Sequence, residues 1–289
     1  MKLYNREELK AIQVQGDPVT FKHPTLAEDF ADRFEVAKSL FDKMNLRLAR
    51  DCNNFTFEEE HGLTTTKWED DEIPDKIYAH QNSGPAFSYD LDYMVGPKDW
   101  HGDADAKKVG DYVLRRKIYL YDWTRERAQE AGIELPEEMD FFLDMIDTFK
   151  PMLEHYRDEC LADQANDIRF YMTKMMLIEY STPLATDDNR DDHRAFCMER
   201  FGDEHCDEAL LGLHLGESVI EFEGQNCTTG EWSEVDGLDS DTGVFLFSEF
   251  AERSGWKPTF HRMIPHPDRW GDAASRYVIV VDYQGRYKD

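Results

Sequence analysis

The stretch LGLHLGESVIEFEGQN (residues 211–226) combines an apolar run with a histidine, glycines and acidic side chains. Four more stretches follow it: GEWSEV (230–235), TGVFLF (242–247), KPTFHRM (257–263) and SRYVIVVDY (275–283). Short runs rich in β-branched and aromatic residues, separated by Gly, Asp and Pro, are typical of strands. This part of the chain is therefore predicted to be built from strands.

The expected strands are residues 168–180, 218–222, 243–247 and 276–283. Turn-forming residues separate them at 227–230, 236–239 and 255–258. The segment 275–283 has the β-branched density of a buried strand. The C-terminal part is accordingly predicted to form an all-β core.

The N-terminal half is predicted to be mostly helical. Thr25 and Glu28 have the spacing of a capping box, which predicts a helix start there, and the apolar positions from Phe30 to Leu48 follow helical spacing to about residue 50. A second helix is expected after Pro136, whereas residues 60–112 are expected to form loops with short strands. Helices followed by many short strands favour an α+β, mainly β fold in which N-terminal helices pack on the all-β core.

Composition excludes several classes of function. The 289 residues include 61 acidic against 33 basic side chains, a net charge of −28, which repels phosphate backbones and anionic membranes. Neither nucleic acid nor a membrane is therefore an expected partner, and a small-molecule substrate, amino-acid-like or cationic, is expected instead. The five cysteines form no C-x-x-C pair, and the N-terminal residues lack a secretory signal, so a cytoplasmic location with reduced thiols is expected.

The order and spacing of the quoted C-terminal motifs resemble the C-terminal half of the isopenicillin N synthase-like family of Fe(II)/2-oxoglutarate oxygenases. The resemblance covers roughly residues 167–285. It implies a double-stranded β-helix, also called a jelly-roll or cupin-like core. Residues 1–289 are then one oxygenase domain, with a mostly helical portion at 1–166 and the catalytic core at 167–289.

The resemblance also implies a set of site residues. His214 stands where the family's strand opens with His-x-Asp, and His261 stands in its Thr-x-His-Arg motif, so both are predicted to bind Fe(II). Ferrous iron binds imidazole and carboxylate ligands while leaving positions open for an oxo acid and O₂. Arg276 is predicted to bind the distal carboxylate of 2-oxoglutarate. Arg169 and Tyr171, on the first core strand, are further candidates for co-substrate contacts.

Gly216 departs from the family pattern, because it occupies the position of the aspartate ligand. Alternate strand residues face the same way, so His214 and Gly216 are expected to share a face. The known enzymes with His-x-Gly are halogenases, in which chloride fills the vacancy at the iron. The resemblance therefore implies a halogenase that acts on an aliphatic carbon and takes Fe(II), 2-oxoglutarate, O₂ and chloride.

Three alternatives remain open. Glu217 is one alternative carboxylate ligand, which would make the protein a hydroxylase, desaturase or oxidative cyclase, although a regular strand directs it away from His214. His205-Cys206-Asp207 is a second His-x-Asp sequence, although it follows a helix-like stretch and no apolar strand is expected in register behind it. A metal-free site would leave a non-catalytic acidic binding protein on a jelly-roll scaffold.

Overall fold

The computed structural model describes residues 3–44, 89–95, 113–181 and 204–287, except 29, 133, 165, 166, 208, 265, 272 and 274. Within these ranges the helices are α1 (Arg6–Gln15), α2 (Pro24–Glu28), α3 (Phe30–Met44), α6 (Thr124–Ala131) and α7 (Glu137–Leu161), with 3₁₀ helices η3 (Ala162–Gln164), η4 (Glu249–Ser254) and η5 (Pro267–Trp270). The strands are β1 (Val19–Lys22), β2 (Tyr89–Val95), β3 (Val113–Tyr121), β4 (Ile168–Ser181), β5 (Leu211–Glu217), β6 (Phe222–Gln225), β7 (Trp232–Glu234), β8 (Thr242–Phe247), β9 (His261–Met263) and β10 (Ser275–Tyr287).

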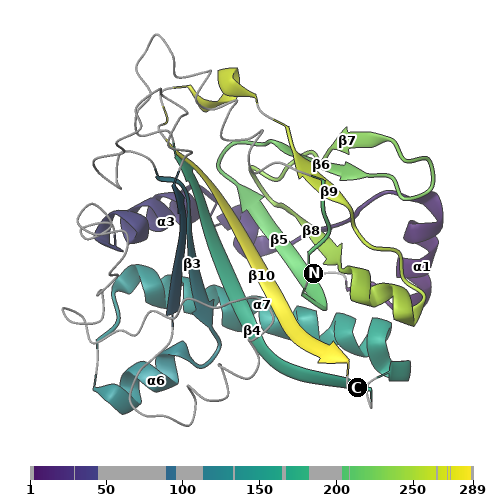
Figure 1. The fold of residues 1–289 in the computed structure, drawn as a ribbon, viewed down its shortest axis with the longest axis horizontal. Coiled ribbons are helices and arrows are strands. Elements are labelled where there is room, and N and C mark those ends of the chain that lie inside the picture. The colour runs from purple at the N-terminus through teal and green to yellow at the C-terminus, as the bar shows by residue number, and fades with distance from the viewer. Residues whose placement is uncertain are drawn as a thin grey trace.

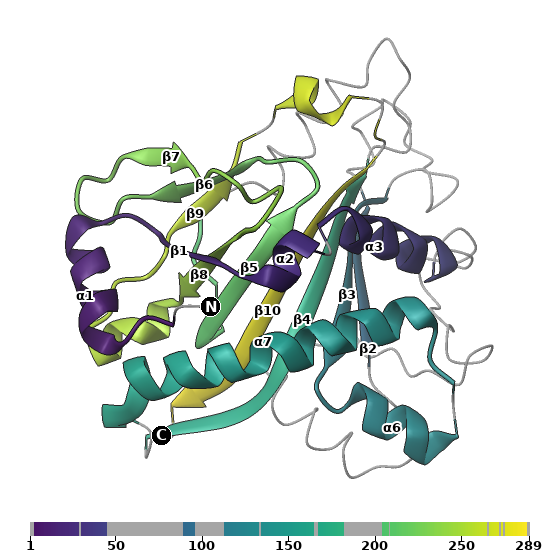
Figure 2. The same cartoon turned by 180° about the vertical axis from the view of Figure 1, so that it is seen from behind.

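The fold combines helices with two antiparallel sheets (Figure 1). The larger sheet has the strand order β1-β8-β5-β10-β4-β3-β2, and the smaller one has the order β7-β6-β9. Helices α3 and α7 cross one face of the larger sheet (Figure 2). A separate buried cluster joins its other face to the smaller sheet. The candidate site described below lies where β9 of the smaller sheet begins.

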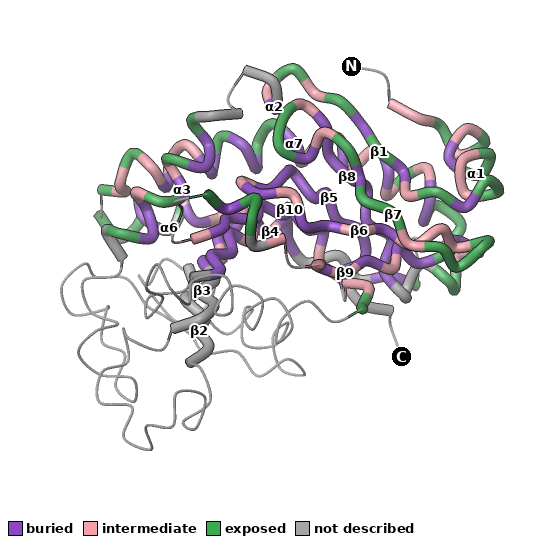
Figure 3. The backbone as a smooth tube through the Cα atoms, turned by 90° about the horizontal axis from the view of Figure 1, so that it is seen from above, coloured by how far each residue is buried: buried purple, intermediate pink, exposed green. Residues whose placement is uncertain are grey.

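Strand β10, inside the larger sheet, contributes side chains to both buried clusters. Its side chains Tyr277, Ile279 and Val281 belong to the cluster that faces the helices, whereas Val278 and Val280 belong to the cluster between the sheets. This alternation follows from the two-residue period of a strand. The strand is buried along most of its length (Figure 3), so the predicted strand at 276–283 is confirmed and extended at both ends.

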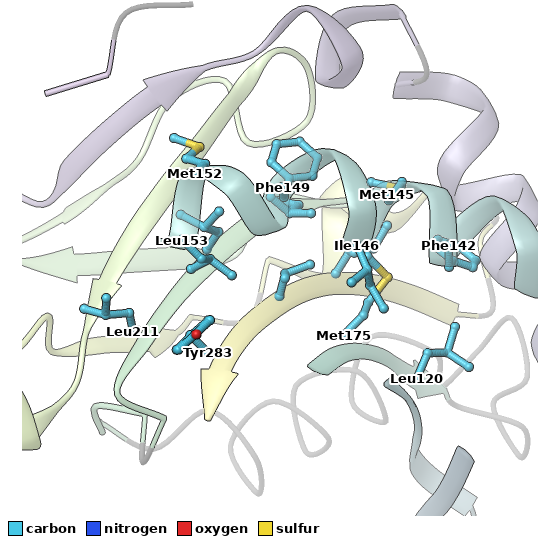
Figure 4. Packing of buried hydrophobic residues seen from close by; sticks show 14 of the residues in the cluster. Leu120, Phe142, Met145, Ile146, Phe149, Met152, Leu153, Met175, Leu211 and Tyr283 are labelled. Carbon is cyan, nitrogen blue, oxygen red and sulfur yellow. The ribbon is translucent and has the colours of Figure 1, made fainter. Parts of the chain in front are cut away.

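Helix α7 begins after Pro136, as predicted, and carries acidic residues in its first turn, where they stabilise the helix dipole. Its apolar residues recur at helical spacing and are buried against the sheet (Figure 4). Phe149 is fully buried there and packs against Phe21 and His23, at ring-centroid distances of 6.4 and 4.8 Å. The helix therefore joins the N-terminal segment to the core.

Other predictions need correction. The helix expected at 25–50 corresponds to α2 and α3 within the described residues, and its expected end near residue 50, with Leu48, lies outside them. The strand expected at 218–222 is wrong, because the chain forms β5 before this stretch, bends within it, and begins β6 only at Phe222. The N-terminal portion also contributes β1, β2 and β3 to the larger sheet. Short strands such as β1 are stabilised by pairing with distant segments, here β8, which no local pattern reveals.

Within the described part of the chain, no helix has the length and apolar character needed to cross a membrane.

We expect Phe149→Ala to lower the free energy of unfolding by about 3–5 kcal/mol, because it removes a buried ring and leaves a cavity between α7 and the sheet. Chemical denaturation followed by circular dichroism measures this change. Val14→Ala, at a side chain that is 77% exposed, is the control and should change stability by less than about 0.5 kcal/mol. Equal effects of the two substitutions would contradict the assigned role of α7.

Candidate metal centre

Two histidines from distant parts of the sequence lie side by side at the start of β9. The backbone N–H of His205 donates to the carbonyl of His261 at 3.0 Å, and the N–H of His261 donates to the carbonyl of His205 at 2.8 Å. Such a reciprocal pair fixes both backbones in extended conformation next to each other. The two imidazole rings consequently lie with their centroids 4.3 Å apart.

Asp207 completes a group of three potential metal ligands. One ligand atom from each of His205, Asp207 and His261 lies within 4.8 Å of the other two, and Asp207 Oδ1 is 3.9 Å from His261 Nε2. Residues two apart on an extended segment face the same side, so His205 and Asp207 converge. His205 is exposed, Asp207 is half-buried and His261 is buried, so the group leads from the surface into the protein. Two imidazoles and one carboxylate are the ligand set of non-haem Fe(II) sites with open coordination positions.

His261 is well prepared to bind a metal through Nε2. Its Nδ1 lies 3.1 Å from the carbonyl oxygen of Thr259, which accepts the Nδ1 proton and leaves Nε2 with a free lone pair on the side of Asp207. Burial lowers the pKa of His261, and the charge of Asp207 opposes this shift only in part. The imidazole is therefore neutral, as a metal ligand must be.

His214, the other histidine predicted to bind iron, lies on β5 and is not part of this group. The backbone N–H of Gly216 donates to its Nδ1 at 3.2 Å, and its Nε2 lies 3.2 Å from Glu217 Oε1. Both ring nitrogens are thus engaged within the protein. The ring of Phe222 contacts both histidines, with its centroid 4.9 Å from that of His214 and 5.1 Å from that of His261. The structure therefore brings His261 together with His205 and Asp207.

A β-bulge explains why the expected facing of β5 fails. Val280 of β10 pairs with His214 and the preceding Ile279 pairs with Gly216, so Leu215 is the extra residue. The bulge breaks the two-residue alternation, and Glu217 returns to the side of His214 instead of pointing away from it.

Gly216 is required by the backbone of this bulge. Its φ is +127°, a conformation that side chains with a Cβ rarely adopt. A Cβ at this position would also lie 2.6 Å from both Arg33 Nη2 and the carbonyl oxygen of Leu238. Gly216 therefore has a structural explanation that needs no ligand in the place of its missing side chain.

The fully buried Arg276 and Glu217 form an ion pair, with Arg276 Nη2 2.5 Å from Glu217 Oε1. Glu221 also contacts this guanidinium, with its Oε2 3.3 Å from Arg276 Nε. Burial opposes ionisation of Glu217, but the charge of Arg276 and the hydrogen bond with His214 outweigh it and lower the pKa of Glu217 to about 2. Burial raises the pKa of Glu221, although Arg276 opposes this change. The predicted co-substrate anchor thus already holds carboxylates of the protein.

The other predicted co-substrate contacts lie elsewhere on β4. Arg169 pairs with Arg286 through the backbone, at the opposite end of β4 from Tyr180, which pairs with Arg276. The side chains of Arg169 and Tyr171 lie outside the described residues. The backbone register therefore separates Arg169 from Arg276 by most of the strand.

In the sequence, His205 and Asp207 are only an alternative to His214 as the predicted ligands. The signal that favours them is the apolar strand β5, which begins at Leu211, shortly after Asp207. The sequence pattern predicts the strand at 218–222 instead of at β5, because this apolar run resembles a strand more closely than the glycine-containing run before it.

We expect the stability difference between the wild type and Glu217→Gln to depend on pH. A carboxyl group whose pKa falls on folding stabilises the protein above its unfolded value, here 4.5, and loses this contribution as the pH falls through about 2. The advantage of the wild type should therefore narrow by roughly 3 kcal/mol between pH 5 and pH 2, as measured by urea unfolding. Glu223→Gln, which removes a carboxylate from the partly exposed pair with Arg262, is the control. If the stability difference between the wild type and Glu217→Gln stayed constant from pH 5 to pH 2, this would contradict an ionised pair of Glu217 and Arg276.

No protein-family model matches the chain, and neither does any curated protein. Solved structures do match. Dioxygenase for auxin oxidation 1 from Arabidopsis thaliana, in its 2-oxoglutarate complex, has a TM-score of 0.53 and 11% identity, over 99% of this chain and 90% of that one. The full-length Neurospora crassa protein solved with alpha-KG and thymine has a TM-score of 0.54 and 14% identity, over 98% and 82%. Dioxygenase for auxin oxidation from rice has a TM-score of 0.52 and 14% identity, over 96% and 78%. The chain therefore shares the fold of 2-oxoglutarate-binding oxygenases.

Proposed function

We propose that this protein is an Fe(II)-dependent oxygenase that uses a 2-oxo acid as co-substrate. The observation that carries the proposal is the group formed by His205, Asp207 and His261, on a fold shared with such oxygenases. Bound iron would supply the activation of O₂ in the presence of the oxo acid. The class of reaction is that of a hydroxylase, desaturase or oxidative cyclase, because a carboxylate completes the ligand set. We also assign the two facing sheets to a double-stranded β-helix.

The residues around the three ligands would support this activity. The carbonyl of Thr259 orients the His261 ring and keeps its metal-binding nitrogen unprotonated. Phe222 stacks on the same ring with an interplanar angle of 15° and excludes water from that side. The exposed imidazole of His205 leaves an approach from the surface. One wall of the site is thus rigid and apolar, and the other is accessible.

The substrate is proposed to be a small molecule. The Neurospora crassa protein of the same fold was solved with thymine, and its complexes contain alpha-KG. The surface of this chain, with its net charge of −28, favours cationic or amino-acid-like metabolites over anions in the approach to the site. 2-Oxoglutarate is the co-substrate that the family resemblance implies.

A halogenase is not the function that this site supports best. Its rationale was the missing carboxylate at Gly216, whereas Asp207 offers a carboxylate beside His205 and His261. With Asp207 as a ligand, the metal therefore has no coordination position left vacant by a missing carboxylate for chloride to fill. A non-catalytic binding protein is a weaker proposal for a similar reason, since it leaves the convergence of three metal-binding side chains unexplained.

We expect wild-type protein to bind one Fe(II) per chain under anaerobic conditions, as measured by calorimetric titration. His205→Ala, Asp207→Ala and His261→Ala should each weaken binding by about 100-fold or more, because each removes a ligand. His214→Gln is the matched control at a buried histidine and should keep iron stoichiometry, with folding verified by circular dichroism. Loss of iron in the His214 variant together with full binding in the His205 and Asp207 variants would reject this ligand set.

A second experiment distinguishes oxygenation from halogenation. Chloride should leave the visible spectrum of the wild-type protein with Fe(II) and an oxo acid unchanged, whereas Asp207→Gly should make this spectrum sensitive to chloride, because it removes the carboxylate ligand. Gly216→Asp should lower stability by about 2 kcal/mol or more through its positive φ and close contacts, without changing the iron spectrum. A chloride-dependent wild-type spectrum that Gly216→Asp abolishes would favour the halogenase instead.

A further inference from the structure

We propose that Glu217 determines the class of co-substrate, by occupying the side of Arg276 that a distal co-substrate carboxylate would need. The chain would then favour a 2-oxo acid with an uncharged distal end over the dicarboxylate 2-oxoglutarate. This inference rests on the proposed function and concerns the same site.

Arg276 lies where the distal end of an oxo acid would be recognised. Its Nη2 donates to Met263 Sδ at 3.2 Å, and Met263 is buried on the same face of β9 as His261, two residues further along. Alternate residues of a strand are about 7 Å apart. The buried guanidinium of Arg276 thus contacts the residue of β9 that follows the proposed metal ligand His261 on the same face of the strand.

The positive charge of Arg276 is already neutralised within the protein. Glu217 Oε1 is 2.5 Å from Nη2, and Glu221 Oε2 is 3.3 Å from Nε. The Nε also donates to the carbonyl of Val219 at 3.1 Å. Arg276 and Glu217 are both 0% exposed. A further carboxylate would therefore add an uncompensated negative charge to a buried site, which is the unfavourable case for burial of ions.

Glu217 is held in this position from several sides. Its Oε2 accepts a hydrogen bond from the backbone N–H of Glu221 at 2.8 Å, and its Oε1 lies 3.2 Å from His214 Nε2. His214 is fixed in turn by the N–H of Gly216, within the bulge that orients Glu217. Displacement of this carboxylate by a ligand would break each of these contacts. The ion pair of Glu217 with Arg276 is therefore fixed by the structure of β5 and β10.

One nitrogen of Arg276 remains available. Nη1 is buried and has no hydrogen-bond partner among the described residues. A single remaining donor group suits a neutral acceptor, such as a carbonyl, ester or hydroxyl oxygen, because neutral acceptors bring no additional charge. The co-substrates that fit are thus 2-oxo monocarboxylic acids, with or without a neutral oxygen at the distal end.

The test is an anaerobic titration of the Fe(II)-loaded full chain, followed by the visible charge-transfer band and by calorimetry. The probes are 2-oxoglutarate, its 5-methyl ester and 2-oxopentanoate, which share a chain length and differ at the distal end. Wild-type protein should bind the ester or 2-oxopentanoate roughly 10-fold or more tightly than 2-oxoglutarate. Glu217→Gln should tighten 2-oxoglutarate binding by about 10-fold and change the neutral probes little. Glu223→Gln, which alters a carboxylate on neighbouring β6, should change none of the three.

Each outcome decides between the proposals. Tighter binding of 2-oxoglutarate by the wild type, or an unchanged order of affinities in Glu217→Gln, would overturn this inference while leaving the iron site intact. Absence of iron binding would overturn the proposed function itself. Iron binding without a spectral response to any oxo acid would overturn both. If Glu217→Gln does not fold, the wild-type order of affinities still decides the question.

Discussion

The antiparallel pairing of β10 with β4 and β5 is the constraint on which the rest of the structure depends. A central strand buried on both faces must direct alternate side chains into two separate clusters. One cluster holds α7 and α3 against the sheet, and the other joins the smaller sheet to the larger one. The smaller sheet carries His261, so the pairing of β10 indirectly positions the proposed metal centre.

The bulge in β5 determines which polar residues meet between the sheets. Because Leu215 is the extra residue, Glu217 shares a side with His214 and reaches Arg276. A regular strand would direct Glu217 toward the helices, and Arg276 would then lack its closest buried counter-ion. The glycine at 216 is the local condition for this arrangement, because its positive φ excludes most other residues.

The polar groups between and beside the sheets form two sets, and Phe222 contacts a histidine of each. In one set, His205, Asp207 and His261 converge with a free imidazole nitrogen, which suits a metal ion. In the other set, the ion pair of Arg276 and Glu217 is engaged with groups of the protein itself. His214, the histidine nearest to Glu217, has both ring nitrogens engaged within the protein.

Local pattern in the sequence was sufficient to predict α7 and the strands β4, β8 and β10, because periodicity and turn residues act over a few positions. It also contained His205-Cys206-Asp207, but could not rank this sequence above His214, since the choice depends on where β5 begins. The bulge at Leu215, the pairing of β1 with β8 and the reciprocal bonds of His205 with His261 arise between segments far apart in the chain. Only the tertiary structure decided these features, because hydrogen-bond register between distant strands is set by how their faces pack, and not by any single stretch of residues.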